Sequence, residues 1–397
     1  MYSFVQEQDL VSEQRKARMK AEYRICAHCV MDTSDPSIVF DERGICDHCI
    51  TFEREILPNW HPNEEGRRKL DSMLEEIRRR GRGKDFDCII GVSGGLDSSY
   101  LTHLAYTEFN LRPLVFHVDA GWNSPQAVHN IERLVEILGL ELFTEVIDWD
   151  EMRDLQLAFF KAGVPHIDTP QDHAFFAAMY KFAERYDIGY ILTGSNYATE
   201  GINNPLNWMY YQSDIVQLRD IHRRFGTRPL RTFPTTNVLR HKLYLPYIKR
   251  IKVVRPLNYV AYSKQHAERI LAEDIGWRSY PQKHFESRFT AFYEGFWLIH
   301  KFGYDTRRVK FSSLILTGQM TRAAAMEQLK RAPMDDETAA REFSYVADKL
   351  NVSQEELRSY LKAPNKTFRD YRSQAWVYQF GGALARMIRF EPGGVRR

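Results

Sequence analysis

Seven consecutive residues with the chemistry of a phosphate-binding loop follow an apolar run, 86–92, that predicts a buried strand. The segment after them, 100–106, predicts a helix. A turn at such a junction exposes backbone N–H groups at a helix N-terminus, where the helix dipole favours an anion. Glycines let a phosphate approach, hydroxyls donate hydrogen bonds and a carboxylate can hold magnesium. The loop consists of Ser93, Gly94, Gly95, Leu96, Asp97, Ser98 and Ser99.

The loop lacks the Gly-Lys-Ser/Thr of a Walker motif. It resembles the PP-loop of the ATP pyrophosphatase superfamily, whose members split ATP between the α and β phosphates and adenylate a carbonyl oxygen. The resemblance implies a doubly wound parallel α/β sheet of the adenine nucleotide alpha hydrolase type, with ATP and Mg²⁺ as ligands. A purely structural turn is the alternative, which the full seven-residue pattern between a strand and a helix disfavours.

Two C-x-x-C knuckles with 16 residues between them predict a zinc site. Residues 41–44 between the knuckles predict a hairpin turn. Four thiolates complete a tetrahedron, which makes the zinc structural and leaves His28 and His48 as peripheral donors. Two disulfides are the alternative, and they require an oxidising compartment. The predicted ligands are Cys26, Cys29, Cys46 and Cys49; the fifth cysteine, Cys88, is expected to be buried in the first strand.

Composition limits the class of protein. The 397 residues suffice for two or three domains, and 44% are apolar. A net charge of +3, from 55 basic and 52 acidic residues, argues against a nucleic-acid partner that needs a large basic face, although a local basic groove stays open. No apolar run is long enough for membrane insertion, and the N-terminus carries no hydrophobic signal region, so a cytoplasmic location is expected.

The order of predicted elements gives the domain organisation. Strands and helices alternate up to about residue 250, as in a parallel sheet, and after that the pattern is helical. The expected strands are 86–92, 113–118, 142–147 and 188–193, with helices at 98–109, 125–138 and 171–186, the last capped by Thr169. The expected C-terminal helices are 263–274, 286–301, 310–317, 321–330, 336–350, 353–361 and 367–387. The expected parts are an N-terminal arm (1–24), a zinc-binding module (25–57), a linking helix (58–84, helical at 64–80), a PP-loop domain (85–250) and a helical C-terminal domain (251–397) that ends in a loose tail at 390–397.

Residues at the ends of two other strands are expected near the nucleotide, because ligands bind at the C-terminal ends of parallel strands. Val118 and Asp119 end the second strand. The superfamily resemblance implies that backbone groups near Val118 contact adenine, while Asp119 either faces the adenosine or caps the following loop. After the fourth strand, Gly194, Asn196 and Glu200 are candidates for contact with the nucleotide or magnesium, and Asn196 could instead only serve the turn.

Further stretches resemble the N-acetyl sugar amidotransferase family, in the expected order from about residue 24 to 385. They are 29–36 (CVMDTSDP), 169–177 (TPQDHAFFA), 283–293 (KHFESRFTAFY), 301–305 (KFGYD) and 312–315 (SSLI). Members convert an acetamido group of a nucleotide-linked sugar to an acetamidino group, in lipopolysaccharide O-antigen or nonulosonic acid pathways. The resemblance implies a UDP- or CMP-linked N-acetyl sugar as substrate. It also implies ammonia from a glutaminase with a cyclase-like partner, both resembling the imidazole glycerol phosphate synthase pair.

The cysteine count agrees with an external ammonia source, because a glutaminase needs an activated Cys and none is left after the metal ligands and Cys88. Asp97 is expected to hold magnesium at the loop, Lys283 to act as an electrostatic clamp, and His284 and Glu286 to deprotonate ammonium or orient the substrate. An ordinary salt-bridge cluster at a helix start is the alternative. A second polar cluster is His166, Asp168, Asp172 and His173, with helix capping as a partial explanation. Five arginines either bind the substrate phosphates or form a surface helix face: Arg219, Arg223, Arg224, Arg228 and Arg231.

Two other functions fit parts of the pattern. A PP-loop tRNA-thiolating enzyme shares the ATP loop and a zinc ribbon, but most such enzymes need non-zinc cysteines near the cleft, and only Cys88 remains. A non-enzymatic scaffold for the glutaminase is disfavoured by the intact 93–99 loop.

Overall fold

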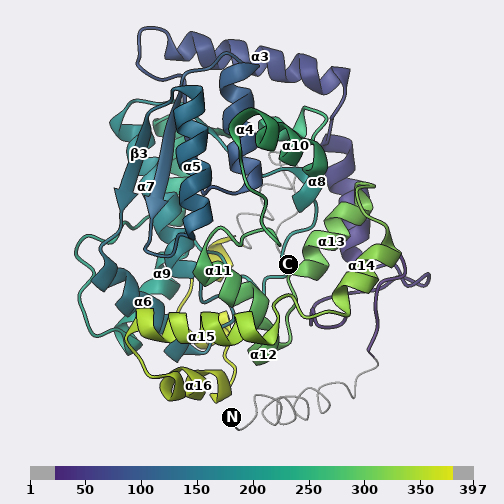
Figure 1. Ribbon diagram of the computed structural model, residues 1–397, viewed down its shortest axis with the longest axis vertical. Coiled ribbons are helices and arrows are strands. Elements are labelled where there is room, and N and C mark those ends of the chain that lie inside the picture. Colours follow the sequence, from purple (N-terminus) through teal and green to yellow (C-terminus); the bar gives the residue numbers. More distant parts are fainter. Residues whose placement is uncertain (1–22, 379–397) are drawn as a thin grey trace.

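The computed structural model describes residues 23–378, and its centre is a five-stranded parallel sheet of order β3-β2-β1-β4-β5 (Figure 1). The predicted N-terminal arm and C-terminal tail therefore fall almost wholly outside the described residues. The chain runs outward from β1 through β2 to β3 and then returns to the other side of β1. The loops after β1 and β4 consequently leave neighbouring strands at the same edge of the sheet. The strands are β1 Cys88–Gly91, β2 Pro113–Asp119, β3 Leu142–Val146, β4 Tyr190–Leu192 and β5 Lys252–Val254.

The doubly wound α/β sheet is confirmed, but the sequence-based expectation of helices alone after residue 250 was wrong. Strand β5 pairs in parallel with β4, with Ile191 opposite Val253. It has only three residues, and Val253 on this edge strand is half exposed, so the segment shows no apolar alternation to identify it. The sheet therefore continues past the expected boundary at 250.

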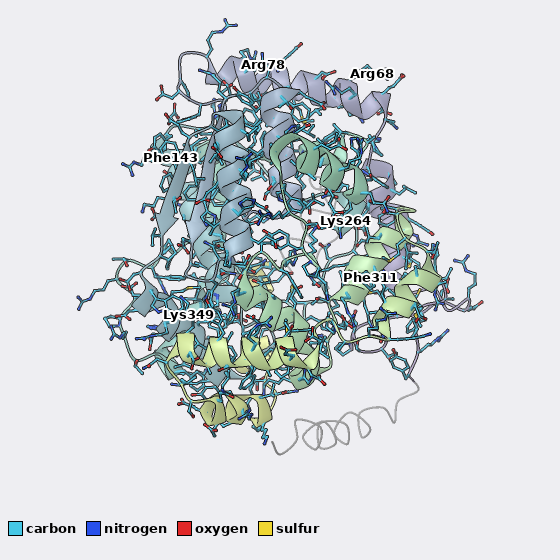
Figure 2. All side chains as sticks on the ribbon, in the orientation of Figure 1. Arg68, Arg78, Phe143, Lys264, Phe311 and Lys349 are labelled. Atoms are coloured by element: carbon cyan, nitrogen blue, oxygen red, sulfur yellow. The ribbon has the colours of Figure 1, made fainter. Side chains whose placement is uncertain are left out.

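Helices cover both faces of the sheet, and the alternation of side chains along β1 supplies both cores. Cys88 and Ile90 belong to the core under one set of helices, whereas Ile89 belongs to the other core. The first set is α3 Glu64–Gly81, α4 Leu96–Thr107, α5 Pro125–Leu138 and α10 Lys264–Ile275. Arg68 and Arg78 mark the length of α3 along the top of the molecule in Figure 2. Helix α10 lies within the expected C-terminal domain, yet it packs against α4.

The second set was only partly predicted. It comprises α6 Trp149–Ala162, α7 Thr169–Arg185 and α9 Ile215–Phe225, and of these only α7 was expected. The N-cap of α7 is Asp168 rather than the predicted Thr169, which is the first helical residue. The core beneath this set continues without a break into the C-terminal helices and the four knuckle cysteines.

The C-terminal helices lie around the lower part of Figure 1. The predicted helix 286–301 is a helical run whose centre, Tyr293–Trp297, is π-helical. The flanking and following helices are α11 Arg288–Phe292, α12 Leu298–Phe302, α13 Arg307–Leu316, α14 Arg322–Leu329, α15 Asp336–Leu350 and α16 Gln354–Lys362. Where 367–387 was predicted as one helix, the described part holds a 3₁₀ turn, Phe368–Asp370, and a helix that begins at 375, and the remainder lies outside the described residues.

The shorter elements complete the described fold. They are α2 Asp47–Thr51, α8 Tyr197–Glu200, π-helical Phe52–Ile56 and Arg240–Ile248, and 3₁₀ turns Leu57–Asn59 and Pro256–Asn258. The predicted hairpin turn between the knuckles is present, with Phe40 bridged to Cys46 and Gly44 in the left-handed region at φ 78°. No helix among residues 23–378 is apolar over a length that would cross a bilayer.

Candidate active site

The 93–99 loop is a tight turn from β1 into the N-terminus of α4. Gly94 has φ +79°, and a Cβ on it would lie 2.6 Å from the Ala127 carbonyl oxygen of α5. Only glycine fits there without strain. Gly95 is the N-cap of α4 and makes no side-chain cap, so the first N–H groups of the helix face the loop. This geometry provides an anion site of the predicted kind.

The Gly94 carbonyl is held from outside the loop by three donors. They are Asn130 Nδ2 at 3.2 Å, Trp277 Nε1 at 3.1 Å and the Tyr280 hydroxyl at 3.1 Å. A backbone carbonyl has two lone pairs, so three donors fix its direction firmly. The adjoining Gly95 N–H turns the other way and donates to Ser93 Oγ at 3.3 Å. The three donors belong to no motif, and nothing in the sequence pointed to them.

The serine hydroxyls of the loop are in two different situations. Ser93 Oγ lies 3.5 Å from Ser98 Oγ, and Ser98 Oγ donates to the Gly95 carbonyl at 3.3 Å. Ser99 is fully buried, and its hydroxyl has no hydrogen-bond partner among residues 23–378. Ser93 and Ser98 are therefore placed to meet an anion, whereas a phosphate contact for Ser99 stays a prediction.

Lys283 joins the two loops that follow β1 and β4. Its Nζ lies 2.6 Å from Asp97 Oδ2, in the first turn of α4, and 2.6 Å from Glu200 Oε1, at the end of α8. Burial opposes the lysine charge, but the two carboxylates outweigh it and raise the pKa of Lys283. The Tyr262 hydroxyl donates to the other oxygen of Asp97. Lys283 thus lies at the phosphate loop, its action as a clamp stays a prediction, and Tyr262 is a neighbour of Asp97 that the sequence analysis missed.

The same two carboxylates fit a magnesium ion. They come from adjacent loops and already share one cation, Lys283. Carboxylate oxygens are the ligands that Mg²⁺ prefers, with phosphates and water completing its octahedron. Asp97 and Glu200 are therefore the residues that would hold it.

His284 lies beside a buried carboxylate rather than against the loop. Its Nδ1 is 3.0 Å from Glu294 Oε1, and Lys310 pairs with the other Glu294 oxygen. Burial opposes the charge of Glu294, but Lys310 and His284 together lower its pKa. Lys310 also donates to the Lys283 carbonyl at 3.2 Å. His284 has φ +72°, an uncommon backbone conformation for a side chain of this size.

Glu286 reaches the phosphate loop itself. Its Oε1 accepts a hydrogen bond from Ser93 Oγ at 3.3 Å. A Cβ on Gly95 would lie 2.7 Å from the same oxygen. The backbone carbonyl of Glu286 accepts from the Ser124 N–H at 2.9 Å. Of the three residues predicted in this stretch, Lys283 and Glu286 contact the loop, and His284 contacts Glu294.

The end of β2 favours the capping interpretation of Asp119. Its Oδ1 accepts from the Gly121 N–H at 2.8 Å and from Asn123 Nδ2 at 3.2 Å. Val118 is buried within β2. His117 Nδ1–H donates to the Val92 carbonyl at 2.8 Å, and Nε2 accepts from Asn123 at 2.9 Å, which ties the β2 loop to the start of the phosphate loop. Burial lowers the pKa of His117.

The loop after β4 packs onto the N-terminus of α4. A Cβ on Gly194 would lie 2.7 Å from the backbone carbon of Asp97, so glycine permits this approach. Asn196 caps α8 by accepting from the Thr199 N–H at 2.9 Å, and its Nδ2 donates to the Gly194 carbonyl at 3.0 Å. These contacts agree with the alternative in which Asn196 only stabilises the turn, and its contact with a nucleotide stays a prediction.

The second polar cluster gathers three of its four predicted members. Asp168 accepts from Thr290 Oγ1 at 2.7 Å, and burial, with Asp172 as the second cause, raises its pKa. His166 Nε2 lies 3.3 Å from Asp172. His173 points elsewhere: its Nδ1–H donates to the Gln212 carbonyl at 2.7 Å, and its Nε2 accepts from the Thr236 N–H at 3.1 Å.

Three of the five arginines, Arg219, Arg223 and Arg224, lie on helix α9, and the other two, Arg228 and Arg231, lie after its end. Arg223 and Arg224 pair with Asp220 on their own helix α9, and Arg228 pairs with Asp150 at 2.9 Å. Arg219 and Arg231 are exposed. The helix-face alternative therefore accounts for the three arginines on α9, and binding of substrate phosphates by the group stays a prediction.

The four knuckle cysteines form a cluster that fits zinc. All four sulfurs lie within 4.8 Å of one another, with neighbouring pairs at 3.6, 3.7 and 3.9 Å, and none is in a disulfide. A tetrahedron with Zn–S bonds of about 2.3 Å has S···S edges of about 3.8 Å. The N–H groups of residues 28, 29 and 46 point at the Cys26 sulfur, a pattern that stabilises a thiolate. His48 binds Asp35 at 2.8 Å and His28 is exposed, so both are peripheral as predicted.

The metal module is attached to the C-terminal helices. Arg322 of α14 donates to the carbonyls of Cys26 and Cys29 at 2.9 and 3.0 Å. Ser312 of α13 accepts from the Val30 N–H at 3.1 Å. Helix α13 in turn packs on α8, which ends at Glu200. The metal cluster is therefore connected to the candidate active site through α13.

Comparison with known proteins divides the chain into two recognisable parts. Residues 286–384 match the family described as LPS biosynthesis protein WbpG-like, C-terminal domain, and residues 87–189 match the phosphoadenosine phosphosulfate reductase domain. The chain is therefore a PP-loop protein. More narrowly, the chain combines this PP-loop match with a match to the WbpG-like C-terminal domain.

Other similarities are more distant. Sulfate adenylyltransferase subunit 2 of Streptomyces lavendulae is 38% identical over 76 residues, which is 18% of this chain and 24% of that relative's own length. NMN synthetase from Francisella tularensis aligns over 57% of this chain and 91% of its own, with a TM-score of 0.28 and 17% identity. NH3-dependent NAD synthetase from Campylobacter jejuni aligns over 64% and 97%, with a TM-score of 0.32 and 12% identity. Similarity at this level has no bearing on activity or substrate.

Proposed function

We propose that this protein is an ATP-dependent amidotransferase that converts the acetamido group of a nucleotide-linked sugar to an acetamidino group, in lipopolysaccharide O-antigen or nonulosonic acid biosynthesis. One observation carries the proposal. Glu286, the first residue of the WbpG-like match, contacts Ser93 of the phosphate loop, and Lys283, three residues before that match, contacts Asp97. The two matched parts therefore meet in one site.

The chemistry explains why both parts are needed. An amide carbonyl is a poor electrophile and its oxygen a poor leaving group. Attack of that oxygen on the α-phosphate of ATP forms an O–P bond, breaks the α–β phosphate bond and gives an adenylated imidate and pyrophosphate. Ammonia then adds at the carbon, AMP departs, and a proton is lost. The protein must hold the pyrophosphate, align the reactants and exclude water.

The residues divide these tasks. The N–H groups at the start of α4, with Ser93 and Ser98, would bind the pyrophosphate. Mg²⁺, held by Asp97 and Glu200, would neutralise phosphate charge. Lys283 supplies a further positive charge beside the phosphate loop. His284 and Glu286 are the proton acceptors for ammonium, and Glu294 positions His284.

The ammonia is proposed to come from a partner glutaminase with a cyclase-like subunit. All five cysteines lie among the described residues: four form the metal cluster, and Cys88 is fully buried with a pKa raised by burial. A thiol in that situation is a poor nucleophile. We propose that the reaction takes place in the cytoplasm and that nucleic acid is neither a substrate nor a partner.

The test is turnover of UDP- and CMP-linked diacetamido sugars with ATP and ammonium chloride, read by mass spectrometry. The expected product is lighter by the difference between an oxygen and an NH group, and AMP and pyrophosphate accompany it. Asp97→Ala should abolish all three products. If no sugar is converted while pyrophosphate still exchanges into ATP, the sugar reaction is wrong and tRNA thiolation becomes the next substrate class to assay.

A further inference from the structure

A single short segment places one positive and one negative side chain in the proposed nucleotide site. The positive one lies where a magnesium ion would bind, and the negative one lies where a phosphate group would bind. The Lys283 ammonium lies between Asp97 and Glu200, 2.6 Å from each, the position of a cation shared by those carboxylates. Three residues later, the Glu286 carboxylate lies against Ser93 and Gly95 at the N-terminus of α4, the position of an anion bound by the loop. We call residues 283–286 the occupying segment.

The Glu286 carboxylate and a phosphate group exclude each other at the loop. The contact is close, because a Cβ on Gly95 would be 2.7 Å from Glu286 Oε1 and 3.2 Å from Ser93 Oγ. A carboxylate is favourable at a helix N-terminus, as a phosphate is. Two anions at one helix end repel, however, and the same donors cannot serve both.

We propose that the occupying segment fills the nucleotide site of the ligand-free protein, and that Mg·ATP displaces Glu286 from the loop and Lys283 from between its two carboxylates. The displaced ammonium then pairs with the triphosphate, and the displaced carboxylate is released to accept a proton. The inference rests on the ATP-binding half of the proposed function and is independent of the sugar.

The backbone around the segment is held, so the exchange is one of side chains. Ser124 N–H donates to the Glu286 carbonyl and Arg288 N–H to the Trp122 carbonyl, each at 2.9 Å. Lys310 holds the Lys283 carbonyl at 3.2 Å. The long Lys and Glu side chains can change rotamer while these anchors persist. Glu286 would be released only after ATP fills the loop. ATP would therefore bind before Glu286 accepts a proton from ammonium.

The first test measures binding of ATP and of pyrophosphate without magnesium, by calorimetry, to the wild type and to Glu286→Gln. The variant keeps the shape of the side chain and removes its charge, so it should bind both ligands at least about fivefold more tightly. Glu273→Gln removes the same charge from an exposed position on α10 and should leave the affinity unchanged. Glu286→Ala repeats the test without a side-chain amide, and thermal melting checks that each variant is folded.

Equal or weaker binding by both Glu286 variants overturns the inference. Binding by neither the wild type nor the variants overturns it together with the ATP-dependent function. Tighter binding by the Glu286 variants, with no sugar turnover by the wild type, upholds the inference while the proposed reaction fails.

A second test uses Mn²⁺ alone as the probe, followed by electron paramagnetic resonance. Lys283→Met leaves Asp97 and Glu200 without their shared cation, so the variant should bind Mn²⁺ at least about tenfold more tightly than the wild type. Unchanged Mn²⁺ affinity in a folded variant shows that Lys283 does not occupy the cation position and contradicts the inference.

Discussion

At the scale of single residues, the direction of one carbonyl group determines how the phosphate loop presents its N–H groups. Three donors hold the Gly94 carbonyl outward, and two of them, Trp277 and Tyr280, follow α10. Gly94 is free to rotate because it carries no Cβ, so without these donors the peptide could turn its carbonyl toward the anion. The donors therefore pre-organise the loop for phosphate.

This argument predicts the effect of Tyr280→Phe. Loss of one hydrogen bond worth about 1 kcal/mol should raise the KM for ATP about fivefold, with little change in thermal stability because two donors remain. Tyr247→Phe on the exposed π-helical segment is the matched control and should change neither quantity. An unchanged KM in the Tyr280 variant would mean that the remaining donors suffice.

The effect of Glu294→Gln on stability is expected to depend on pH. The folded pKa of Glu294 lies below its unfolded value of about 4.3, because Lys310 and His284 outweigh burial. Charged Glu294 thus stabilises the folded protein at pH values above its unfolded pKa, and this contribution is lost as the pH falls toward the folded pKa. The variant should be markedly less stable than the wild type at pH 7, and the difference should shrink at pH 3.5 in urea unfolding. A difference that does not vary with pH would contradict the assignment.

At the scale of elements, the sequence identifies those that have a pattern of their own. Caps, glycines and apolar spacing mark strands β1 to β4 and the helices α3, α4, α5 and α7, so these elements were predicted. Helix α6 had the same signals, with Asp148 as N-cap and Gly163 after its end, and was overlooked. Strand β5 could not be predicted, because three residues are too few to show periodicity and their pairing with β4 is a tertiary effect.

The same distinction applies to the site. The members on the loops after β1 and β4 were predictable from the motif and from the rule that ligands bind at the ends of parallel strands. The pairing of Lys283 with Asp97 joins positions 186 residues apart, and nothing local encodes it. Tyr262 and the donors to Gly94 have no motif, so only the folded chain shows their roles.

The four-cysteine module contacts the C-terminal helices, and these contacts predict what the loss of a zinc ion from the module would do. Cys29→Ser, or chelation, should release zinc and reduce stability by several kcal/mol, because the folded loop depends on the ion. The loss should extend to α13 and α14, which bind the knuckle backbone through Ser312 and Arg322. Hydrogen exchange of these helices and metal analysis are the measurements.

The matched control for that experiment is Cys88→Ser, which alters a buried cysteine outside the cluster. It should keep a full complement of zinc and the protection of α13. Faster exchange confined to residues 25–57 after zinc loss would show that the module does not support the helices.

At the scale of the whole molecule, one hydrophobic core links parts that a sequence-based division would separate. Cys49 of the metal module, Phe116 of β2 and Phe343 of α15 belong to the same cluster of buried side chains. Arg288, at the start of α11, adds a bidentate pair with Glu342 of α15 at 2.9 and 3.0 Å and lies over the Tyr345 ring at 3.3 Å. The sheet and the C-terminal helices therefore bury each other's apolar surface.

The shared core predicts how the protein unfolds. Parts with separate cores can melt separately, whereas parts that share one lose their buried surface together. Scanning calorimetry should therefore show a single transition for the PP-loop sheet and the C-terminal helices, and zinc removal should shift that transition downward without dividing it. Arg288→Ala should also lower it, because the Glu342 carboxylate loses its bidentate partner. Two transitions, with zinc affecting only one of them, would mean that the metal module and its helices fold independently of the sheet. In that case the contacts from the cysteine cluster through α13 to Glu200 would not stabilise the active site.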